Sequence, residues 1–410
     1  MQIRPITENE LETSRALCYV AFEFNIDGAP TPASSAQKII TTPQTRMKQQ
    51  YQDTLAAFDE DGSMVACVSP CTLDTQLDGN IVQLMGVGDV AALPCCQGKG
   101  VMKQLFSRLL HDAYDHSIEL SYLYPFSGSY YRQFGYSYCL RTVMWRLRLS
   151  LLPKFSTHGT VKLYNPTFLA DIKCIYRKFT TSFNLAIQRE DIEWYSVIGQ
   201  YDPCVDRVFT YVYYSSEGVA EGYMTYRKQD ALGGSEMYCT QFAYTCRQAL
   251  MGLLDFARSR QAYHEYVTIT LPDNIRLELL LPEFDMSPAT KSIIGAAMRG
   301  MVRVVHLPNA VRAARFVGDG DVTIAISDSY LTQNAGVWQL SWRGGQCTEL
   351  QRLAQTHADL CMGIDLFSNL LCKGILPEDI PLLPAEAIGS DPSLLLRLSP
   401  HKSVGIFEYF

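Results

Sequence analysis

A glycine-rich turn between an apolar strand and an amphipathic helix is the segment of this sequence best suited to chemistry. The strand pattern covers residues 81–92, the turn contains Gly98 and Gly100, and apolar side chains recur at helical spacing directly after it. Bare backbone at such a turn lets N–H groups point at an anion, and the helix dipole strengthens their pull. Lys99 and Lys103 stand where their charges could screen phosphates. The segment predicts a pyrophosphate cradle, although a plain strand–helix turn would carry the same glycines.

Other chemistries find less support in the residue pattern. The turn matches neither G-x-G-x-x-G nor G-x-x-x-x-G-K-[ST], which disfavours a dinucleotide or ATP site. None of the 13 cysteines forms a C-x-x-C pair and no H-E-x-x-H occurs, so we expect no metal site. The vicinal pair Cys95-Cys96 has no histidine beside it in the sequence, so a catalytic thiol is disfavoured as well.

Composition limits the class of protein before any element is placed. The chain has 410 residues, 47% of them hydrophobic, and a formal net charge of -7. The acidic balance argues against a nucleic-acid partner, which usually calls for a basic footprint. The sequence has no apolar run long enough to cross a membrane and no secretory leader pattern. We therefore expect a cytoplasmic protein with several domains and no membrane partner.

Strand and helix patterns alternate along the chain and predict an α/β protein with mixed sheets. A Pro/Gly/Ser-containing linker at 151–159 and the change of pattern after Pro288 suggest three domains, at residues 1–150, 151–288 and 289–410. In the second block Tyr244-Thr-Cys-Arg-Gln248 takes the place of the glycine turn. Strand patterns cover, among others, residues 64–69, 81–92 and 302–307.

Three segments give the chain a family resemblance. The glycine turn resembles the acetyl-CoA-binding element of the GNAT N-acetyltransferases, with Cys95 where Gln or Arg is usual. The segment Leu123-Tyr-Pro-Phe-Ser-Gly-Ser-Tyr-Tyr-Arg-Gln-Phe-Gly-Tyr136 is similar to a signature of the Eis-like acetyltransferases. The hairpin Asn334-Ala-Gly-Val-Trp338 and the terminus Phe407-Glu-Tyr-Phe410 extend the resemblance over the whole chain. It implies tandem GNAT domains, the second without the cradle and catalytically silent, followed by a sterol-carrier-like α+β domain.

The resemblance also implies an activity. Acetyl-CoA would be the co-substrate, and a primary amine on a small molecule or peptide would attack it directly in a ternary complex without a metal. Tyr131 would protonate the leaving thiolate, with its neighbour Tyr130 as the rival, and the carboxylate of Phe410 would act as the base. Polyamines, aminoglycosides and protein lysines stay open as acceptors. By analogy the chain would form a homo-oligomer, a trimer or hexamer.

Binding residues carry over by position. The acceptor wall would include Phe22, Phe24 and Asp27 after the first helix, with Glu408 in the tail, because aromatic and acidic groups suit a cationic amine. The alternative function is a non-enzymatic sensor or scaffold that binds CoA or a lipid. The residues expected to contact acetyl-CoA are Val90, Ala91, Ala92, Gly98, Lys99, Gly100, Val101, Met102, Lys103, Phe126 and Ser127.

Overall fold

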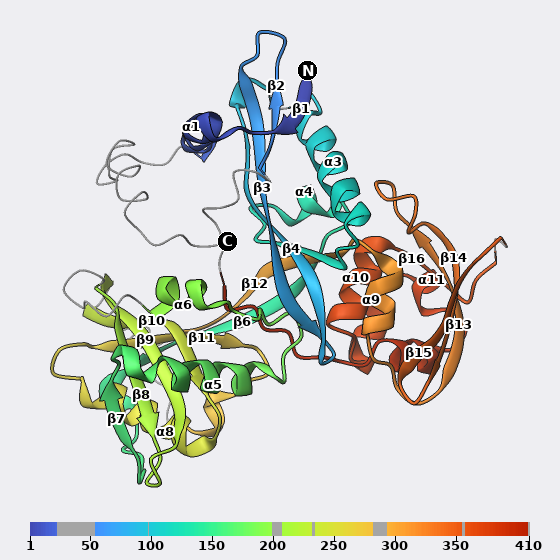
Figure 1. Cartoon of the computed structure of the whole chain (residues 1–410). Coiled ribbons are helices and arrows are strands. Elements are labelled where there is room, and N and C mark those ends of the chain that lie inside the picture. Colours follow the sequence, from blue (N-terminus) through green and yellow to red (C-terminus); the bar gives the residue numbers. More distant parts are fainter. Residues whose placement is uncertain are drawn as a thin grey trace. The chain divides into compact units, whose positions relative to one another are not determined.

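Two compact units make up the chain. The computed structural model describes residues 1–22, 54–96, 98–198, 207–231, 234–281, 293–354 and 357–408. Unit 1 contains the described parts of Met1–Cys139 and Gly300–Lys402 together with Glu408, and unit 2 contains those of Leu140–Arg299 and Ser403–Phe407 (Figure 1). The domain boundaries expected at residues 150 and 288 stay predictions. Within the described ranges, no helix is long and apolar enough to traverse a bilayer.

The first sheet of unit 1 contains the strand that leads into the glycine turn. Its order is β1-β2-β3-β4-β5-β12, with β4 and β5 parallel and their outer neighbours β3 and β12 antiparallel to them. The β2–β3 hairpin closes because the Asp59 carboxylate accepts the N–H groups of Asp61 and Ser63 and Gly62 has a φ of 80°. The strands are β1 (Gln2–Pro5), β2 (Leu55–Phe58), β3 (Met64–Leu77), β4 (Asn80–Ala92), β5 (Leu120–Leu123) and β12 (Ile293–Val304), the last entering unit 1 at Gly300.

Helices cover both faces of this sheet. Side chains alternate along β2, so that Leu55 and Ala57 pack in the cluster of α3 (Val101–Asp115). Ala56 and Phe58 pack instead with α1 (Leu11–Phe22), on the opposite face. Figure 1 shows α1 and α3 on the two sides of these strands. The short helix α4 (Gly128–Arg132) follows β5.

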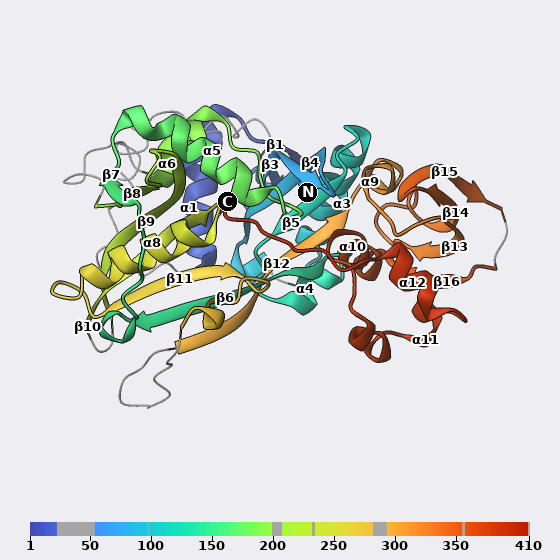
Figure 2. The ribbon, with the colours of Figure 1, turned by 90° about the horizontal axis from the view of Figure 1, so that it is seen from below.

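A smaller sheet completes unit 1. Its order is β15-β14-β13-β16, with β13 and β16 parallel. Two helices, α10 and α12, pack on β13 and β16 (Figure 2). The bounds are β13 (Gly320–Ser327), β14 (Gly336–Arg343), β15 (Gln346–Leu353), β16 (Leu360–Gly363), α9 (Leu307–Ala313), α10 (Ile364–Cys372), α11 (Ala385–Ile388) and α12 (Pro392–Leu398).

Unit 2 repeats the plan of a sheet between helices. Its strands follow the order β6-β11-β10-β9-β8-β7, and β10 and β11 are its parallel pair. On β8 the side chain of Tyr213 packs with α8, whereas Val212 and Tyr214 pack with α5 and α6. The bounds are β6 (Ser137–Arg148), which enters unit 2 at Leu140, β7 (Thr160–Leu163), α5 (Leu169–Thr180), α6 (Asp191–Ile198), β8 (Phe209–Tyr214), β9 (Ala220–Ala231), β10 (Gly234–Tyr244), α8 (Arg247–Ser259) and β11 (Tyr266–Pro272).

Two of the expected strand ranges were wrong. The strand expected at 64–69 continues to Leu77, because residues 70–77 pair with β4 as far as Asn80. The strand expected at 302–307 ends at Val304, since His306 caps α9 and Pro308 lies in its first turn. Neither difference moves the glycine turn or the helix that follows it.

Candidate active site

Strands β4 and β5 separate at the point where the predicted cradle begins. Their parallel pairing ends at Val87 and Leu123, although β4 continues for five more residues to Ala92. Between the β3 residues Cys67 and Ser69 the register with β4 shifts, and Asp89 takes a φ of 48°. Such a bulge bends and twists the strand. The backbone of residues 88–92 therefore leaves β5 and opens a slot between the two strands.

The glycine turn leads from this slot to α3. Gly98 and Gly100 have φ angles of 76° and 74°, which side chains other than glycine rarely adopt. Gly100 is the N-cap of α3 and offers no side chain to the first turn. The first N–H groups of a helix have no carbonyl partner four residues back, so those of Val101 and its successors can bind an anion.

Two lysines add positive charge to this turn. Lys99 and Lys103 are exposed, and within the described residues neither forms an ion pair. Unpaired lysines beside free N–H groups are arranged for a ligand that carries several negative charges. The glycine turn and these two lysines therefore remain the candidate cradle.

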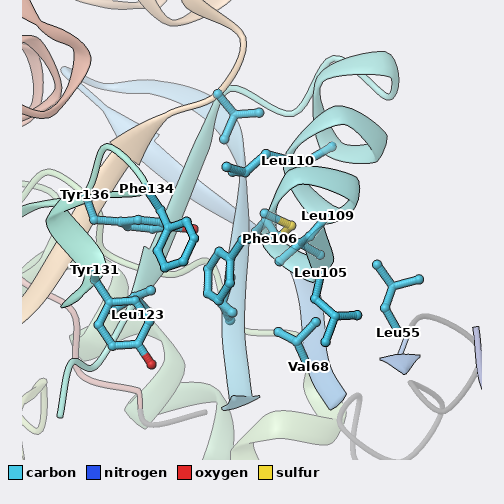
Figure 3. Close-up of a cluster of buried hydrophobic side chains, with 14 of the residues drawn as sticks. Leu55, Val68, Leu105, Phe106, Leu109, Leu110, Leu123, Tyr131, Phe134 and Tyr136 are labelled. Atoms are coloured by element: carbon cyan, nitrogen blue, oxygen red, sulfur yellow. The ribbon is translucent and has the colours of Figure 1, made fainter. Parts of the chain in front are cut away.

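Tyr131 lies in α4, between the helix α3 and the segment that follows β5. The residue is 2% exposed, with its ring edge-on to Phe106 of α3 at 6.0 Å and to Phe126 at 5.4 Å between ring centroids. Within the described part of the chain its hydroxyl makes no hydrogen bond. Figure 3 shows the Tyr131 hydroxyl directed away from the Phe106 and Phe134 rings. The phenol is thus held by its ring while its proton stays available.

The surroundings of Tyr131 keep it protonated. Burial raises the pKa of Tyr131, and the neighbouring hydroxyls of Tyr130 and Tyr136 raise it further. Tyr136 differs, because its hydroxyl is hydrogen-bonded to Ser121 at 2.7 Å, and Ser121 donates to the Met85 carbonyl. The Tyr136 hydroxyl is therefore bound to the sheet through Ser121, whereas the Tyr131 hydroxyl has no such partner among the described residues.

Tyr130 lies on a different side of α4. It is half-buried, and its ring packs on Phe126 and Phe134. Burial, and after it the hydroxyl of Tyr330, raises the pKa of Tyr130. The two tyrosines are thus distinguished by their neighbours: Tyr131 has Phe106 of the cradle helix beside it.

Glu408, the last described residue, contacts the segment that directly follows β5. Glu408 is half-buried, and its carbonyl accepts a hydrogen bond of 2.5 Å from the hydroxyl of Tyr124, the residue after β5. Within unit 2, the ring of Phe407 packs on Phe179 and Phe183 with centroid distances of 5.5 and 5.8 Å. Phe410, the expected base, lies outside the described residues.

The other residues expected to bind acetyl-CoA or the amine lie at several places. Phe126 is 71% exposed beside Tyr131, and Ser127 caps α4 by accepting the N–H of Tyr130. Phe22 ends α1 and is exposed, whereas Phe24 and Asp27 lie outside the described residues. The backbone of Val90, Ala91 and Ala92 forms the slot, and Gly98, Lys99, Gly100, Val101, Met102 and Lys103 form the turn and first helical turn.

The vicinal cysteines Cys95 and Cys96 precede the glycine turn. In the ranges the structure describes, no group of His, Cys, Asp and Glu could hold a metal ion. The thiols of Cys95 and Cys96 lie 3.9 Å apart beside the turn, and burial followed by the Cys95 contact raises the pKa of Cys96. A raised pKa leaves less thiolate, so the Cys96 thiol is a poor nucleophile.

The matching place in unit 2 is built differently. The parallel pairing of β10 and β11 ends at Tyr238 and Thr268, so a slot between strands recurs. At the start of α8, however, the Cys246 thiol caps the helix at the N–H of Ala249 and donates to the Glu221 carboxylate at 3.3 Å. A carboxylate next to this helix end repels a pyrophosphate.

Sequence reasoning missed three contributors to the site in unit 1. Tyr124 holds the tail, Phe106 supports the Tyr131 ring, and Arg303 contacts the turn after α4. Of the three, only Arg303 could have been noticed in the sequence, because it is the single charged residue in the apolar run from Met301 to Val305. A buried charge needs a partner, but the sequence does not say which one.

Three parts of the chain match known families. Residues 2–139 and residues 185–304 each match a family described as an acetyltransferase (GNAT) domain. Residues 307–382 match the sterol carrier protein domain. A comparison with curated proteins found no match.

Solved structures share the fold over the full length of the chain. A protein of unknown function from Enterococcus faecalis, described as a probable N-acyltransferase, has a TM-score of 0.82 at 20% identity, covering 100% of this chain and 99% of its own. A GCN5-related N-acetyltransferase from Anabaena variabilis has a TM-score of 0.82 at 16% identity, covering 100% of both chains. Eis1 from Mycobacterium abscessus has a TM-score of 0.75 at 18% identity, again covering 100% of both. The fold and domain order expected from the resemblance are confirmed.

Proposed function

Since this chain is an acetyltransferase built from two GNAT domains and a sterol carrier protein domain, we propose that unit 1 transfers the acetyl group of acetyl-CoA to a primary amine. One observation carries the proposal. A buried phenol whose hydroxyl has no hydrogen-bond partner in the described chain, Tyr131, lies in the unit that also holds the open strand slot and the glycine turn. Acceptors of the small polyamine, aminoglycoside and peptide-lysine classes are all consistent with this site.

The residues of unit 1 fit acetyl-CoA. Its pyrophosphate needs several donors and positive charge, which the first turn of α3 and the exposed Lys99 and Lys103 supply. Its extended pantetheine needs unpaired backbone along an edge, and β4 offers this beyond Val87. When bound, acetyl-CoA supplies an activated acetyl thioester. The residues of the chain would bind and orient acetyl-CoA, donate a proton to the leaving thiolate and accept a proton from the amine.

Tyr131 would supply one of these protons. Attack of a neutral amine on the thioester carbonyl forms the C–N bond, and breaking the C–S bond releases a thiolate that takes the Tyr131 proton. A phenol near pKa 10 is a weaker acid than a free thiol near 8.5, and burial raises the pKa of either group. Because burial raises the pKa of Tyr131, the phenol is protonated at neutral pH, and its proton passes to the thiolate where the buried thiolate is destabilised more than the phenolate.

The second proton leaves the amine, and we carry the Phe410 carboxylate forward as its acceptor. The contact of Glu408 with Tyr124 supports this role, because it fixes the tail two residues earlier at the exit of β5. We expect that appending a short peptide after Phe410 lowers kcat by about 10²-fold or more, as for loss of an acid–base group. The same peptide placed before Met1 is the control. Unchanged turnover of the C-terminal extension would remove Phe410 from the mechanism.

The second GNAT domain is proposed to be catalytically silent, since Cys246 and Glu221 occupy its helix start. The rival function for the whole chain is a sensor or scaffold that binds CoA or a lipid without turnover. A panel of amines assayed for release of free CoA thiol, with calorimetry of acetyl-CoA and of a fatty acid in parallel, separates the two. We expect thiol release with at least one amine and binding of acetyl-CoA. Tight binding of the fatty acid without thiol release over the panel would favour the sensor.

A further inference from the structure

A fully buried ion pair lies directly behind the turn that follows α4. Arg303 of β12 and Asp328 after β13 are both 0% exposed at their side chains. One guanidinium nitrogen, Nη2, donates to both carboxylate oxygens at 2.8 and 2.7 Å. Burying two charges is costly, and the cost is offset only when the geometry is good and the remaining polar atoms are satisfied. A pair at this position therefore calls for an explanation.

Asp328 is held firmly by the sterol carrier protein domain. Its Oδ1 accepts the N–H groups of Tyr330 and Leu331, both at 3.0 Å, and its Oδ2 accepts the Asn334 amide at 3.2 Å. Asn334 is itself fully buried and donates to the Val305 carbonyl at 2.9 Å. The carboxylate is thus fixed by several donors of its own loop. Its position does not depend on Arg303 alone.

Arg303 connects the Asp328 carboxylate to the backbone of the turn that follows Tyr131. Its Nη1 donates to the Phe134 carbonyl, and the Phe134 N–H in turn donates to the Tyr131 carbonyl at 3.0 Å. Gly135 has a φ of 81°, and a Cβ there would collide with the same Nη1. The glycine therefore lets the guanidinium reach the backbone of the turn. One rigid planar group connects Asp328 to the chain segment that carries the phenol.

We propose that Arg303 and Asp328 are positioning residues that orient Tyr131 for protonation of the leaving thiolate, so that the sterol carrier protein domain sets the geometry of the acid. The inference rests on the proposed function. Proton transfer needs hydrogen-bond reach, and a displacement of about 1 Å at a reacting group can cost on the order of 10²-fold in rate. A domain without the cradle then contributes to turnover by holding the backbone of the Tyr131 turn.

Two variants of the full-length chain test this role. Arg303→Lys keeps a charge for Asp328 but loses the planar fork that donates to Asp328 and Phe134 together. The double variant Arg303→Met with Asp328→Asn removes both charges, while the oxygen of the introduced amide can still accept the loop N–H groups, which guards against misfolding of the single variant. We expect kcat to fall by about 10–100-fold in both, with the KM for acetyl-CoA and amine nearly unchanged.

A matched control is present in unit 2. Arg146 and Glu236 form a buried pair at 2.9 Å, so Arg146→Met with Glu236→Gln imposes a similar loss of stability without touching the Tyr131 turn. In this control we expect kcat of the folded enzyme to be unchanged. A fall in kcat equal to that of the Arg303 variants would overturn the positioning role, because it would show a general effect of lost stability.

The closing measurement combines Arg303→Lys with Tyr131→Phe. If Arg303 acts through the phenol, adding Arg303→Lys to Tyr131→Phe lowers kcat little further, since the two effects are not additive. If the fold-loss of kcat in the double variant equals the product of the losses in the two single variants, the inference is overturned. Unchanged kcat in the folded Arg303 variants overturns it as well. Full activity of Tyr131→Phe alone would instead overturn the proposed acid, and the positioning role with it, so the two failures are distinct.

Discussion

Replacing Tyr131 by phenylalanine is expected to lower kcat by about 10²–10⁴-fold, the usual loss for an acid–base group. The KM for acetyl-CoA should change little, because the proposed contacts with the co-substrate come from the strand slot and the α3 turn and not from the phenol. The ring keeps its packing on Phe106 and Phe126 in the variant, and the removed hydroxyl has no hydrogen bond to lose in the described chain. A large fall in kcat with unchanged stability would thus report on the chemistry.

Tyr130→Phe is the matched control, since it removes the same atom one residue away. We expect it to keep wild-type turnover, because Tyr130 packs on Phe126 and Phe134 on a different side of α4. The pH profile gives a second check. Burial raises the pKa of Tyr131, so the acid form persists at high pH and the rate should not fall as pH rises through 9. Inactive Tyr130→Phe beside active Tyr131→Phe would exchange the two roles.

The parts of the fold with strong local patterns could be predicted from the sequence. The strand expected at 81–92 is β4, Asn80–Ala92, and the helix expected after the turn is α3. The second half of β3 was missed, because Pro70 and Asp74 interrupt the strand pattern. Their positions are decided by pairing with Val87 and Gln83 of β4, which local preference does not reveal. Tertiary contact therefore extended the strand beyond its sequence signal.

The same division holds for the candidate site. The glycine turn and the helix after it could be predicted because they are adjacent in the chain, and their role as a cradle stays a prediction. The contact of Tyr124 with Glu408 joins residues 284 apart, and that of Arg303 with Phe134 joins residues 169 apart. No spacing rule connects such pairs. The charge of Arg303 inside an apolar run could have predicted a buried acidic partner. Only the folded chain identifies that partner as Asp328.

A second large effect is expected in the core that joins the cradle helix to the Tyr131 motif. Phe106 of α3 is 0% exposed, stacks on Phe134 with a centroid distance of 4.2 Å, and meets Tyr131 edge-on. Figure 3 shows its ring between these side chains and the leucines of α3. Phe106→Ala should lower the free energy of unfolding by about 3–5 kcal/mol, because it removes apolar contact and leaves a cavity. Urea unfolding followed by circular dichroism measures this loss.

Phe126→Ala is the control for that substitution. Phe126 is 71% exposed, so its removal should change the free energy of unfolding by only about 0.5 kcal/mol or less. In the fraction of Phe106→Ala that stays folded, kcat should also fall, since the Tyr131 ring loses its support on α3. A Phe106 variant that loses less than Phe126→Ala in stability would contradict the packing. Loss of stability with full kcat would instead show that Tyr131 keeps its position without the support of α3. The hydrogen bond from Arg303 to the Phe134 carbonyl would then be enough to hold the α4 turn in place.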